Sequence, residues 1–366
     1  MANARLNIPR GLSEAQQYSF AGSLCWANAG IVPFAFMKSE FSLAANLNKP
    51  LFLLGTTASG KSAAAMELAR AFGGGERAAI LALDAMQVYR GADIGTSKPS
   101  AADRAEIPHG GLDLVKFGAP FDVAQYLAHA AEFLRVQHEA GRRVIVVGGT
   151  GLYFRAMTRG LCEAPQGSDE LRAELGALSV PALQARLKAV DAPMLERIDA
   201  ANPRRLARAI EVMESTGKSL RAWQDETPEP LAPEFTAIWI QRPKEELDKR
   251  IEARVAAMFS QGWVEEVRRL VARYGLEAVT RFAGIGYREI AEGDRTHTIY
   301  RTSESYKSYE SYPSHDLQRD IFVATRQYAK RQLTWFAREP KLLPVMLTGD
   351  QLVSEALHGA GLTALL

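Results

Sequence analysis

The stretch Leu51–Ser62, LFLLGTTASGKS, constrains the fold more than any other part of the chain. Its four leading apolar residues predict a short buried strand, and Ala63–Arg70 predicts a helix because it is rich in strong helix formers. Between them lies G-x-x-x-x-G-K-S, the P-loop pattern. Its glycines let successive backbone N–H groups face one concavity, Lys61 adds a point charge, and the Ser62 hydroxyl can bind Mg²⁺. The stretch therefore predicts a site for a diphosphate or polyphosphate.

Length and composition fit an ordinary globular protein. The chain of 366 residues has room for one large domain or two modest ones, with 47% hydrophobic and 23% charged residues. Its 44 basic residues nearly balance 42 acidic ones, so any nucleic-acid surface must come from local clustering. Cys25 and Cys162 alone cannot build a disulfide framework or a cysteine-based zinc site. Because no apolar run approaches the roughly 18 residues of a membrane span, we expect a soluble, cytoplasmic protein without membrane contact.

Two more apolar runs, Ala78–Leu83 and Arg143–Val147, predict further strands, and their alternation with helices predicts an α/β fold with a parallel sheet. Asp84 directly follows the first of them. Ligands in such sheets bind at the carboxyl ends of the strands, so Asp84 is expected beside the phosphate site; a turn or cap role is the alternative. The other run leads into Gly148–Gly151 and not into a Walker B carboxylate, which argues against an ATPase motor.

The chain divides by composition into a core, an insertion and terminal extensions. Residues 161–201 carry Pro, Gly and Ser with short helical patterns, which predicts a small helical insertion. Residues 294–316 are rich in Ser and Tyr without apolar periodicity, which predicts a flexible loop. The expected parts are a mobile N-terminal extension (1–48, with Met37 as an alternative start), the P-loop core (49–160 and 202–345), the helical insertion (161–201) and a C-terminal tail (346–366).

Basic residues gather on predicted helices in the second half of the chain. Asn202 is a good N-cap for a helix that Gly217 ends, and arginines crowd its first turns against the helix dipole. This placement favours an anionic backbone as partner, with a solvated helix face as the alternative. A later helix, Arg319–Arg338, interleaves basic residues with Trp335, which suits phosphate and base contacts unless Trp335 belongs to the core. Arg250 and Arg254 lie one helical turn apart and hence on one face.

Six segments in family order resemble the bacterial tRNA dimethylallyltransferases, and they are spread over residues 50–338, which is most of the chain. They are Gly55–Ser62 (GTTASGKS), Asp84–Pro99 (DAMQVYRGADIGTSKP), Gly148–Phe154 (GGTGLYF), Asn202–Leu206 (NPRRL), Gly286–Arg288 (GYR) and Ala324–Trp335 (ATRQYAKRQLTW). The chain departs from the pattern at Thr56, where a proline is usual, and at Ala85, where a serine is usual.

The resemblance implies a P-loop NTPase-like fold and a prenyltransferase activity that depends on Mg²⁺. The family transfers a dimethylallyl group from dimethylallyl diphosphate to N6 of the adenosine just 3′ of the anticodon in tRNA. By resemblance Asp84 is the base, Lys61 and Arg254 neutralise the leaving diphosphate, and Ser62 holds the metal. The implied diphosphate-binding residues are Gly55, Thr56, Thr57, Ala58, Ser59, Gly60, Lys61, Ser62 and Arg254.

The resemblance also implies a surface for the anticodon stem-loop, whose target adenosine must leave the base stack. The implied tRNA-binding residues are Thr57, Asp84, Ala85, Met86, Gln87, Thr150, Arg172, Arg204, Arg205, Leu206, Ala207, Arg208, Gly286, Tyr287, Arg288, Lys330, Arg331 and Gln332. We expect the protein to act as a monomer.

Three other functions remain as alternatives. A P-loop small-molecule kinase would use Asp84 to bind an acceptor hydroxyl, but it would leave the basic helices without a purpose. An adenylate isopentenyltransferase would act on free nucleotide, although the NPRRL and KRQ segments favour tRNA. An RNA-binding protein with a vestigial P-loop is opposed by the intact Lys61, Ser62 and Asp84.

Overall fold

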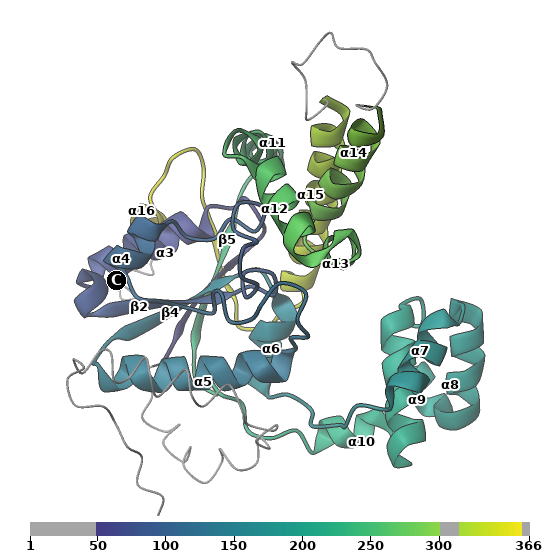
Figure 1. Cartoon of the computed structure of the whole chain (residues 1–366). Coiled ribbons are helices and arrows are strands. Elements are labelled where there is room, and N and C mark those ends of the chain that lie inside the picture. Colours follow the sequence, from purple (N-terminus) through teal and green to yellow (C-terminus); the bar gives the residue numbers. More distant parts are fainter. Residues whose placement is uncertain (1–48, 301–314, 361–366) are drawn as a thin grey trace, which may run out of the picture. The chain divides into compact units, whose positions relative to one another are not determined.

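A parallel β-sheet organises the protein, as the sequence predicts (Figure 1). The computed structural model describes residues 49–300 and 315–360, and of residues 294–300 and 315 it describes only their place in a helix. Within these ranges six strands pair in parallel in the order β3-β2-β4-β1-β5-β6. They are β1 (Leu51–Gly55), β2 (Ala78–Leu83), β3 (His109–Gly110), β4 (Arg143–Gly148), β5 (Thr236–Gln241) and β6 (Leu343–Met346).

Helices cover both faces of the sheet, which is why β1 and β2 are fully buried apolar runs without alternation. One face packs against α3 (Lys61–Ala71) and α16 (Val353–Gly359). The other lies against α5 (Val123–Glu139), α6 (Gly151–Arg159) and α15 (His315–Phe336). Phe52 of β1 meets Phe154 of α6 edge to face there, with ring centroids 5.2 Å apart.

A second apolar core lies among the helices that follow β5. Its buried residues include Ile251, Trp263, Tyr287 and Ile321. The helices that supply them are α11 (Lys244–Ser260), α12 (Trp263–Tyr274), α13 (Leu276–Arg281), α14 (Tyr287–Tyr300) and α15, which Figure 1 shows as a group in green to yellow. Two short elements complete the first half of the chain, η2 (Gly74–Glu76) and α4 (Ala101–Glu106).

The helical insertion extends further along the chain than the predicted 161–201. It comprises α7 (Asp169–Ala177), α8 (Val180–Leu195), α9 (Pro203–Thr216) and α10 (Leu220–Asp225). Helix α9, assigned to the core from its sequence, packs against α7 and α8 through Leu206, Ala209 and Ile210. Its ends are as predicted, because the Asn202 side chain accepts hydrogen bonds from the backbone N–H groups of Arg204 and Arg205, and Gly217 ends the helix at φ 69°.

Two other expectations need correction, and one falls outside the described residues. The predicted loop 294–316 is helical at both ends, since α14 runs to Tyr300 and α15 begins at His315. Helix α14 continues from a first turn anchored by the buried Tyr287, Ile290 and Ala291. Residues 301–314 and the N-terminal extension 1–48 lie outside the described residues.

Residues 346–360 of the predicted C-terminal tail pack on the core, and residues 361–366 lie outside the described residues. Residues Val353, Ala356 and Leu357 of α16 are buried against the sheet side that α3 covers. Glu67 of α3 accepts hydrogen bonds from the backbone N–H groups of Val353 and Ser354, at 2.9 and 3.0 Å, and so caps α16 from a distant part of the chain.

Candidate active site

The P-loop joins β1 to α3 in the conformation that an anion site requires. Ala58 and Gly60 have φ of 60° and 94°, so the backbone N–H groups of the loop turn into one concavity ahead of the first turn of α3. Gly55 is needed for space, because a Cβ there would lie 2.6 Å from the Ser59 Oγ. The loop can therefore present backbone donors and a helix N-terminus to phosphate oxygens.

Three side chains from later parts of the chain hold the loop in place. Arg242 donates from Nε to the Ser59 carbonyl at 2.8 Å, and Arg250 of α11 donates to the Ala58 carbonyl at 3.1 Å. Gln332 of α15 accepts from the Thr57 backbone N–H at 2.8 Å. The sequence indicated none of these bonds; the one available signal was that Arg250 shares a helix face with Arg254.

Lys61 and Arg254 bring two cations to the same cavity, which has a volume of about 800 Å³. The pKa of Lys61 is lowered to about 8, first by burial and then by the positive charge of Arg254, while the Asp84 carboxylate acts to raise it. Burial also lowers the pKa of Arg254, again opposed by Asp84. The Lys61 Nζ donates to the Thr56 carbonyl at 3.0 Å. Two cations destabilised by burial and mutual repulsion form a site that a multivalent anion would stabilise.

Asp84 lies at the carboxyl end of β2, and β4 separates β2 from β1 in the sheet. Its Oδ1 accepts from the backbone N–H groups of Met86 and Gln87, at 2.8 and 3.3 Å. The half-buried side chain also lines the cavity. The two roles weighed from the sequence, turn residue and site residue, are therefore compatible. Thr150, at the N-terminus of α6, accepts from the Ala85 N–H at 3.3 Å and joins the two strand ends.

The structure gathers about half of the sequence-predicted site residues around this cavity. Those lining it are Thr57, Lys61, Ser62, Asp84, Ala85, Met86, Gln87, Thr150, Arg254, Arg331 and Gln332. A second hollow of about 500 Å³ reaches the phosphate side and is lined by Ala58, Gly60, Lys61, Ser62, Ala63, Ser97, Arg250, Ala253 and Arg254. The cavity thus has a cationic P-loop region and a wall formed by the segment that follows Asp84.

Four predicted tRNA-binding residues are buried and serve packing or loop geometry. Leu206 lies in the core of the helical insertion, and Tyr287 is fully buried with its hydroxyl donating to Glu266 at 2.6 Å. Gly286, with φ 93°, packs so closely on Trp263 that a Cβ would lie 2.2 Å from the ring. Gln332 is only 6% exposed and also donates to the Gly149 carbonyl at 3.0 Å, so it holds the P-loop against β4.

Other predicted tRNA-binding residues are cations outside the cavity. Arg172, Arg204 and Arg205 are exposed on the helical insertion, as are Arg288 of α14 and Lys330 of α15. Arg172 pairs with Asp169, whereas Arg208 is tied to the Ala164 and Pro165 carbonyls and to Glu211. Ala207 is half-buried beside them. The exposed side chains remain available to a large anionic partner.

The described ranges 49–300 and 315–360 contain neither a side-chain cluster for a metal ion nor a membrane-spanning helix. No cluster of three His, Cys, Asp or Glu side chains there could hold a metal ion by itself. No helix in the same ranges has the length and apolar character needed to span a membrane.

Sheet, P-loop and cavity together define a P-loop α/β protein. Residues 87–339 match the family model described as IPP transferase. A tRNA dimethylallyltransferase of Methylacidiphilum infernorum is 40% identical over 305 residues, which are 83% of this chain and 88% of that protein. One from Syntrophobacter fumaroxidans is also 40% identical, over 80% of this chain and 81% of that protein. The chain therefore belongs to the IPP transferase family.

Solved structures agree with this assignment. The full-length tRNA isopentenylpyrophosphate transferase of Bacillus halodurans is similar with a TM-score of 0.57 and 26% identity, over 86% of this chain and 95% of that one. A eukaryotic dimethylallyltransferase studied while acting on tRNA reaches a TM-score of 0.68, over 87% of this chain and 77% of that one. Its identity of 22% means that this second likeness concerns the fold.

Proposed function

We propose that this protein transfers a dimethylallyl group from dimethylallyl diphosphate to N6 of the adenosine immediately 3′ of the anticodon in tRNA, releasing diphosphate and giving N6-(dimethylallyl)adenosine. The observation that carries the proposal is that Lys61, Arg254 and Asp84 share one cavity with the P-loop. This arrangement offers cations for a leaving diphosphate and a carboxylate for the proton of the attacking amine. The names of the relatives, tRNA dimethylallyltransferases, support the choice of substrates.

The diphosphate binds at the P-loop end of the cavity in this account. Backbone N–H groups of residues 57–62, the Lys61 ammonium and the Arg254 guanidinium take the charge that develops as the bond between C1 and the bridging oxygen breaks. Arg242 and Arg250 act indirectly, because their hydrogen bonds go to loop carbonyls and fix the direction of the N–H groups. The absence of a carboxylate at the end of β4 fits a loop that holds a leaving group and transfers no phosphoryl group.

Magnesium is the metal that the family resemblance suggests, and the donors present suit it. Ser62 is exposed at the first turn of α3 and lines both hollows next to Lys61. Mg²⁺ is commonly held by one or two protein oxygens together with substrate phosphates, so the Ser62 hydroxyl plus diphosphate oxygens form a sufficient set. When bound there, the ion would neutralise charge on the diphosphate.

Asp84 is the proposed general base. The adenosine N6 attacks C1 of the dimethylallyl group, and the C1–O bond breaks with its electron pair leaving on the diphosphate. The amine proton becomes acidic as the new C–N bond forms, so a carboxylate can accept it late in the reaction. Hydrogen bonds from the Met86 and Gln87 N–H groups hold Asp84 Oδ1 in place.

The RNA would be held by exposed cations and would deliver one extruded base to the cavity. Arg331 is exposed and also lines the cavity, so it can contact a backbone phosphate near the entering nucleotide. Arg204, Arg205, Arg288 and Lys330 are exposed and can contact phosphates farther away.

A transfer assay tests the proposal with purified protein, Mg²⁺ and radiolabelled dimethylallyl diphosphate. One acceptor is an unmodified tRNA with adenosine 3′ of the anticodon, and the other is AMP. The account predicts label in the tRNA and none in AMP. Label in AMP would indicate an adenylate isopentenyltransferase, and no label in either together with tight ATP binding would indicate a small-molecule kinase.

A further inference from the structure

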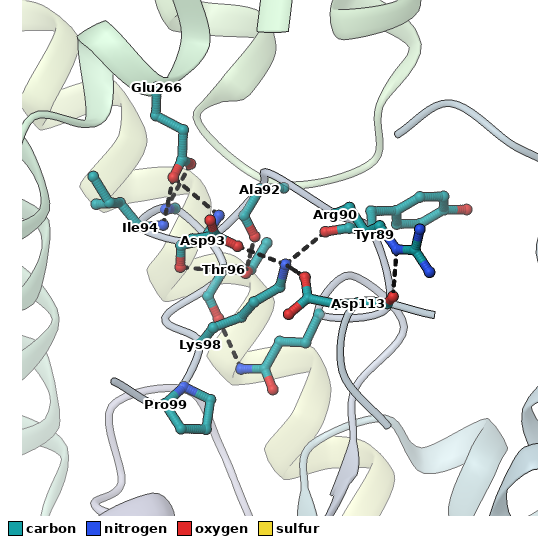
Figure 2. Close-up of polar contacts among 12 residues, drawn as sticks. Tyr89, Arg90, Ala92, Asp93, Ile94, Thr96, Lys98, Pro99, Asp113 and Glu266 are labelled. Carbon is teal, nitrogen blue, oxygen red and sulfur yellow. Dashed lines mark hydrogen bonds and ion pairs between the residues drawn. The ribbon is translucent and has the colours of Figure 1, made fainter. Parts of the chain in front are cut away.

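The carboxylate of Glu266, on α12, is buried and bonded to the backbone of a distant segment. The residue is 2% exposed. Figure 2 shows its carboxylate directed at the Asp93–Ser97 segment, which lies in the second half of the Asp84–Pro99 motif. It accepts from the N–H groups of Asp93, Ile94 and Gly95, at 2.9, 2.7 and 3.3 Å, and from the Tyr287 hydroxyl at 2.6 Å. One side chain therefore gathers three successive backbone donors.

Packing on Trp263 holds the same segment. Trp263 lies three residues before Glu266 on α12, so both project from one helix face. A Cβ on Gly95 would lie 2.2 Å from the indole Nε1, so only glycine lets the segment approach this closely. Trp263 is buried and also lines the cavity. The Asp93–Ser97 segment is thus fixed against α12 by a hydrogen-bonded carboxylate and by a flat aromatic surface.

The other side of the segment holds Gln87. The Gln87 side-chain amide donates to the Thr96 and Ser97 carbonyls, at 2.9 and 3.1 Å. Its backbone N–H in turn donates to Asp84 Oδ1 at 3.3 Å. Continuous contacts therefore run from Glu266 through the segment to Gln87 and Asp84. The segment (through residues 95–97), Gln87 and Asp84 all line the cavity.

Lys98, directly after the segment, ties its end to the neighbouring chain by three hydrogen bonds. Its Nζ donates to the Tyr89 carbonyl, to Asp93 and to Asp113, at 2.6, 2.7 and 2.6 Å, and its side chain is 1% exposed (Figure 2). These bonds close the chain from residue 89 to 98 into one loop. The segment is therefore tied at Asp93 and at Lys98, with residues 94–97 between them.

We propose that Glu266 is a positioning residue for the transfer reaction, which holds the Asp93–Ser97 segment so that Gln87 is presented beside Asp84 in the cavity. This inference rests on the proposed function. Glu266 touches no reacting atom and acts through the backbone of the segment. Tyr287 supports it by donating to the same carboxylate; burial and the charge of Glu266 raise the pKa of Tyr287 well above its usual value and so keep the hydroxyl protonated.

The Glu266→Gln substitution tests this with little change in volume. An amide keeps one acceptor oxygen but turns its NH₂ toward a backbone donor, so at least one N–H of the segment loses its partner. The matched control is Glu339→Gln, which alters another buried carboxylate, one that pairs with Arg155 and Arg159. Hydrogen exchange should quicken in peptides covering residues 87–97 of Glu266→Gln and stay unchanged there in Glu339→Gln.

A double-mutant cycle with Gln87→Ala then tests the link to the reaction. We expect Glu266→Gln and Gln87→Ala each to lower kcat/KM for tRNA about tenfold, with the KM for the diphosphate donor unchanged. Because both changes act through the same contacts, the double variant should be about as active as the less active of the two single variants. Tyr287→Phe, which removes a single hydrogen bond, should give about a threefold loss in the same parameter and serves if Glu266→Gln fails to fold.

Fold-losses that multiply in the double variant would overturn the inference, as would a loss in Glu266→Gln no larger than in Glu339→Gln. Unchanged hydrogen exchange over residues 87–97 in Glu266→Gln would overturn it without reference to activity. If the unaltered protein prenylates neither tRNA nor AMP, the proposed function is wrong, whereas the exchange result still decides whether Glu266 holds the segment.

Discussion

The cations of the cavity and those of the helical insertion have opposite surroundings. Lys61 and Arg254 are half-buried in one cavity, where partial burial and the repulsion between the two charges lower the pKa of Lys61 to about 8. Arg204 and Arg205 stand exposed on the first turn of α9, where solvent and salt screen their charges. Two neighbouring half-buried cations favour a compact multivalent anion, whereas exposed cations each add a small increment to the binding of a long polyanion.

Because of this difference, we expect substitutions in the two regions to change different kinetic and binding constants. Changes in the cavity should alter the chemistry or the use of the diphosphate donor, and changes on α9 should alter tRNA affinity and its salt dependence. A cavity variant that changed only tRNA affinity, or an α9 variant that changed only the use of the diphosphate donor, would contradict this expectation.

The largest effect is expected for Asp84→Asn. The amide keeps the shape of the side chain and can still accept from the Met86 and Gln87 N–H groups, but it cannot take the amine proton. Single-turnover transfer should fall by about 10²- to 10⁴-fold while the Kd for tRNA stays within about threefold. Transfer at the normal rate would remove Asp84 from the role of base.

Arg254→Gln should act on the donor. Without the guanidinium, the diphosphate loses one of its two side-chain cations, and kcat/KM for dimethylallyl diphosphate should fall about 100-fold. The Kd for tRNA, measured by filter binding without donor, should be unchanged. A loss confined to tRNA affinity would indicate that Arg254 binds RNA and not the diphosphate donor.

The pH dependence of donor binding should follow Lys61. Because its pKa in the folded protein is about 8, its charge is lost as the pH rises through that value, and diphosphate affinity should fall by up to about tenfold per unit above it. The unfolded chain retains the Lys61 proton up to about pH 10.5. Between about pH 8 and 10.5 the unfolded state therefore binds more protons than the folded state, and the contribution of Lys61 to the free energy of unfolding rises with pH. Calorimetric titration with inorganic diphosphate checks the first trend, and Lys61→Met should abolish it.

The smallest effect is expected on α9. Arg204→Ala and Arg205→Ala should each weaken tRNA binding about threefold near 0.1 M salt and reduce the slope of log Kd against log salt by less than about one unit. Because both cations oppose the helix dipole, the melting temperature should stay the same or rise slightly. An equal loss at all salt concentrations would argue for a packing role.

The sequence predicted those parts of the molecule that depend on neighbouring residues. The strands β1, β2 and β4, the P-loop with its helix, the place of Asp84 after β2 and the Asn202 cap all follow from local patterns, and the structure contains each of them. The proposed roles of the site residues came from the family resemblance and stay predictions.

Contacts between distant residues left no such pattern. Gln332 binds the Thr57 N–H across 275 positions, and Glu67 caps α16 across 286 positions, so neither could be read from spacing. The same cause explains why the burial of Leu206 and Tyr287 was not foreseen. Both stand in motifs that suggested RNA contacts, but their burial depends on which helices pack together. Sequence motifs mark a site without separating its contact residues from the residues that support them.

The most direct test of the central claim, that this cavity prenylates an adenosine amine, compares two anticodon stem-loops that differ in a single group. One carries adenosine immediately 3′ of the anticodon, and the other carries inosine, which has an oxygen in place of the N6 amine. After incubation with labelled dimethylallyl diphosphate and digestion to nucleosides, the account predicts N6-(dimethylallyl)adenosine from the first RNA and no labelled nucleoside from the second. Label at the inosine position, or at any other nucleoside of either RNA, would contradict it.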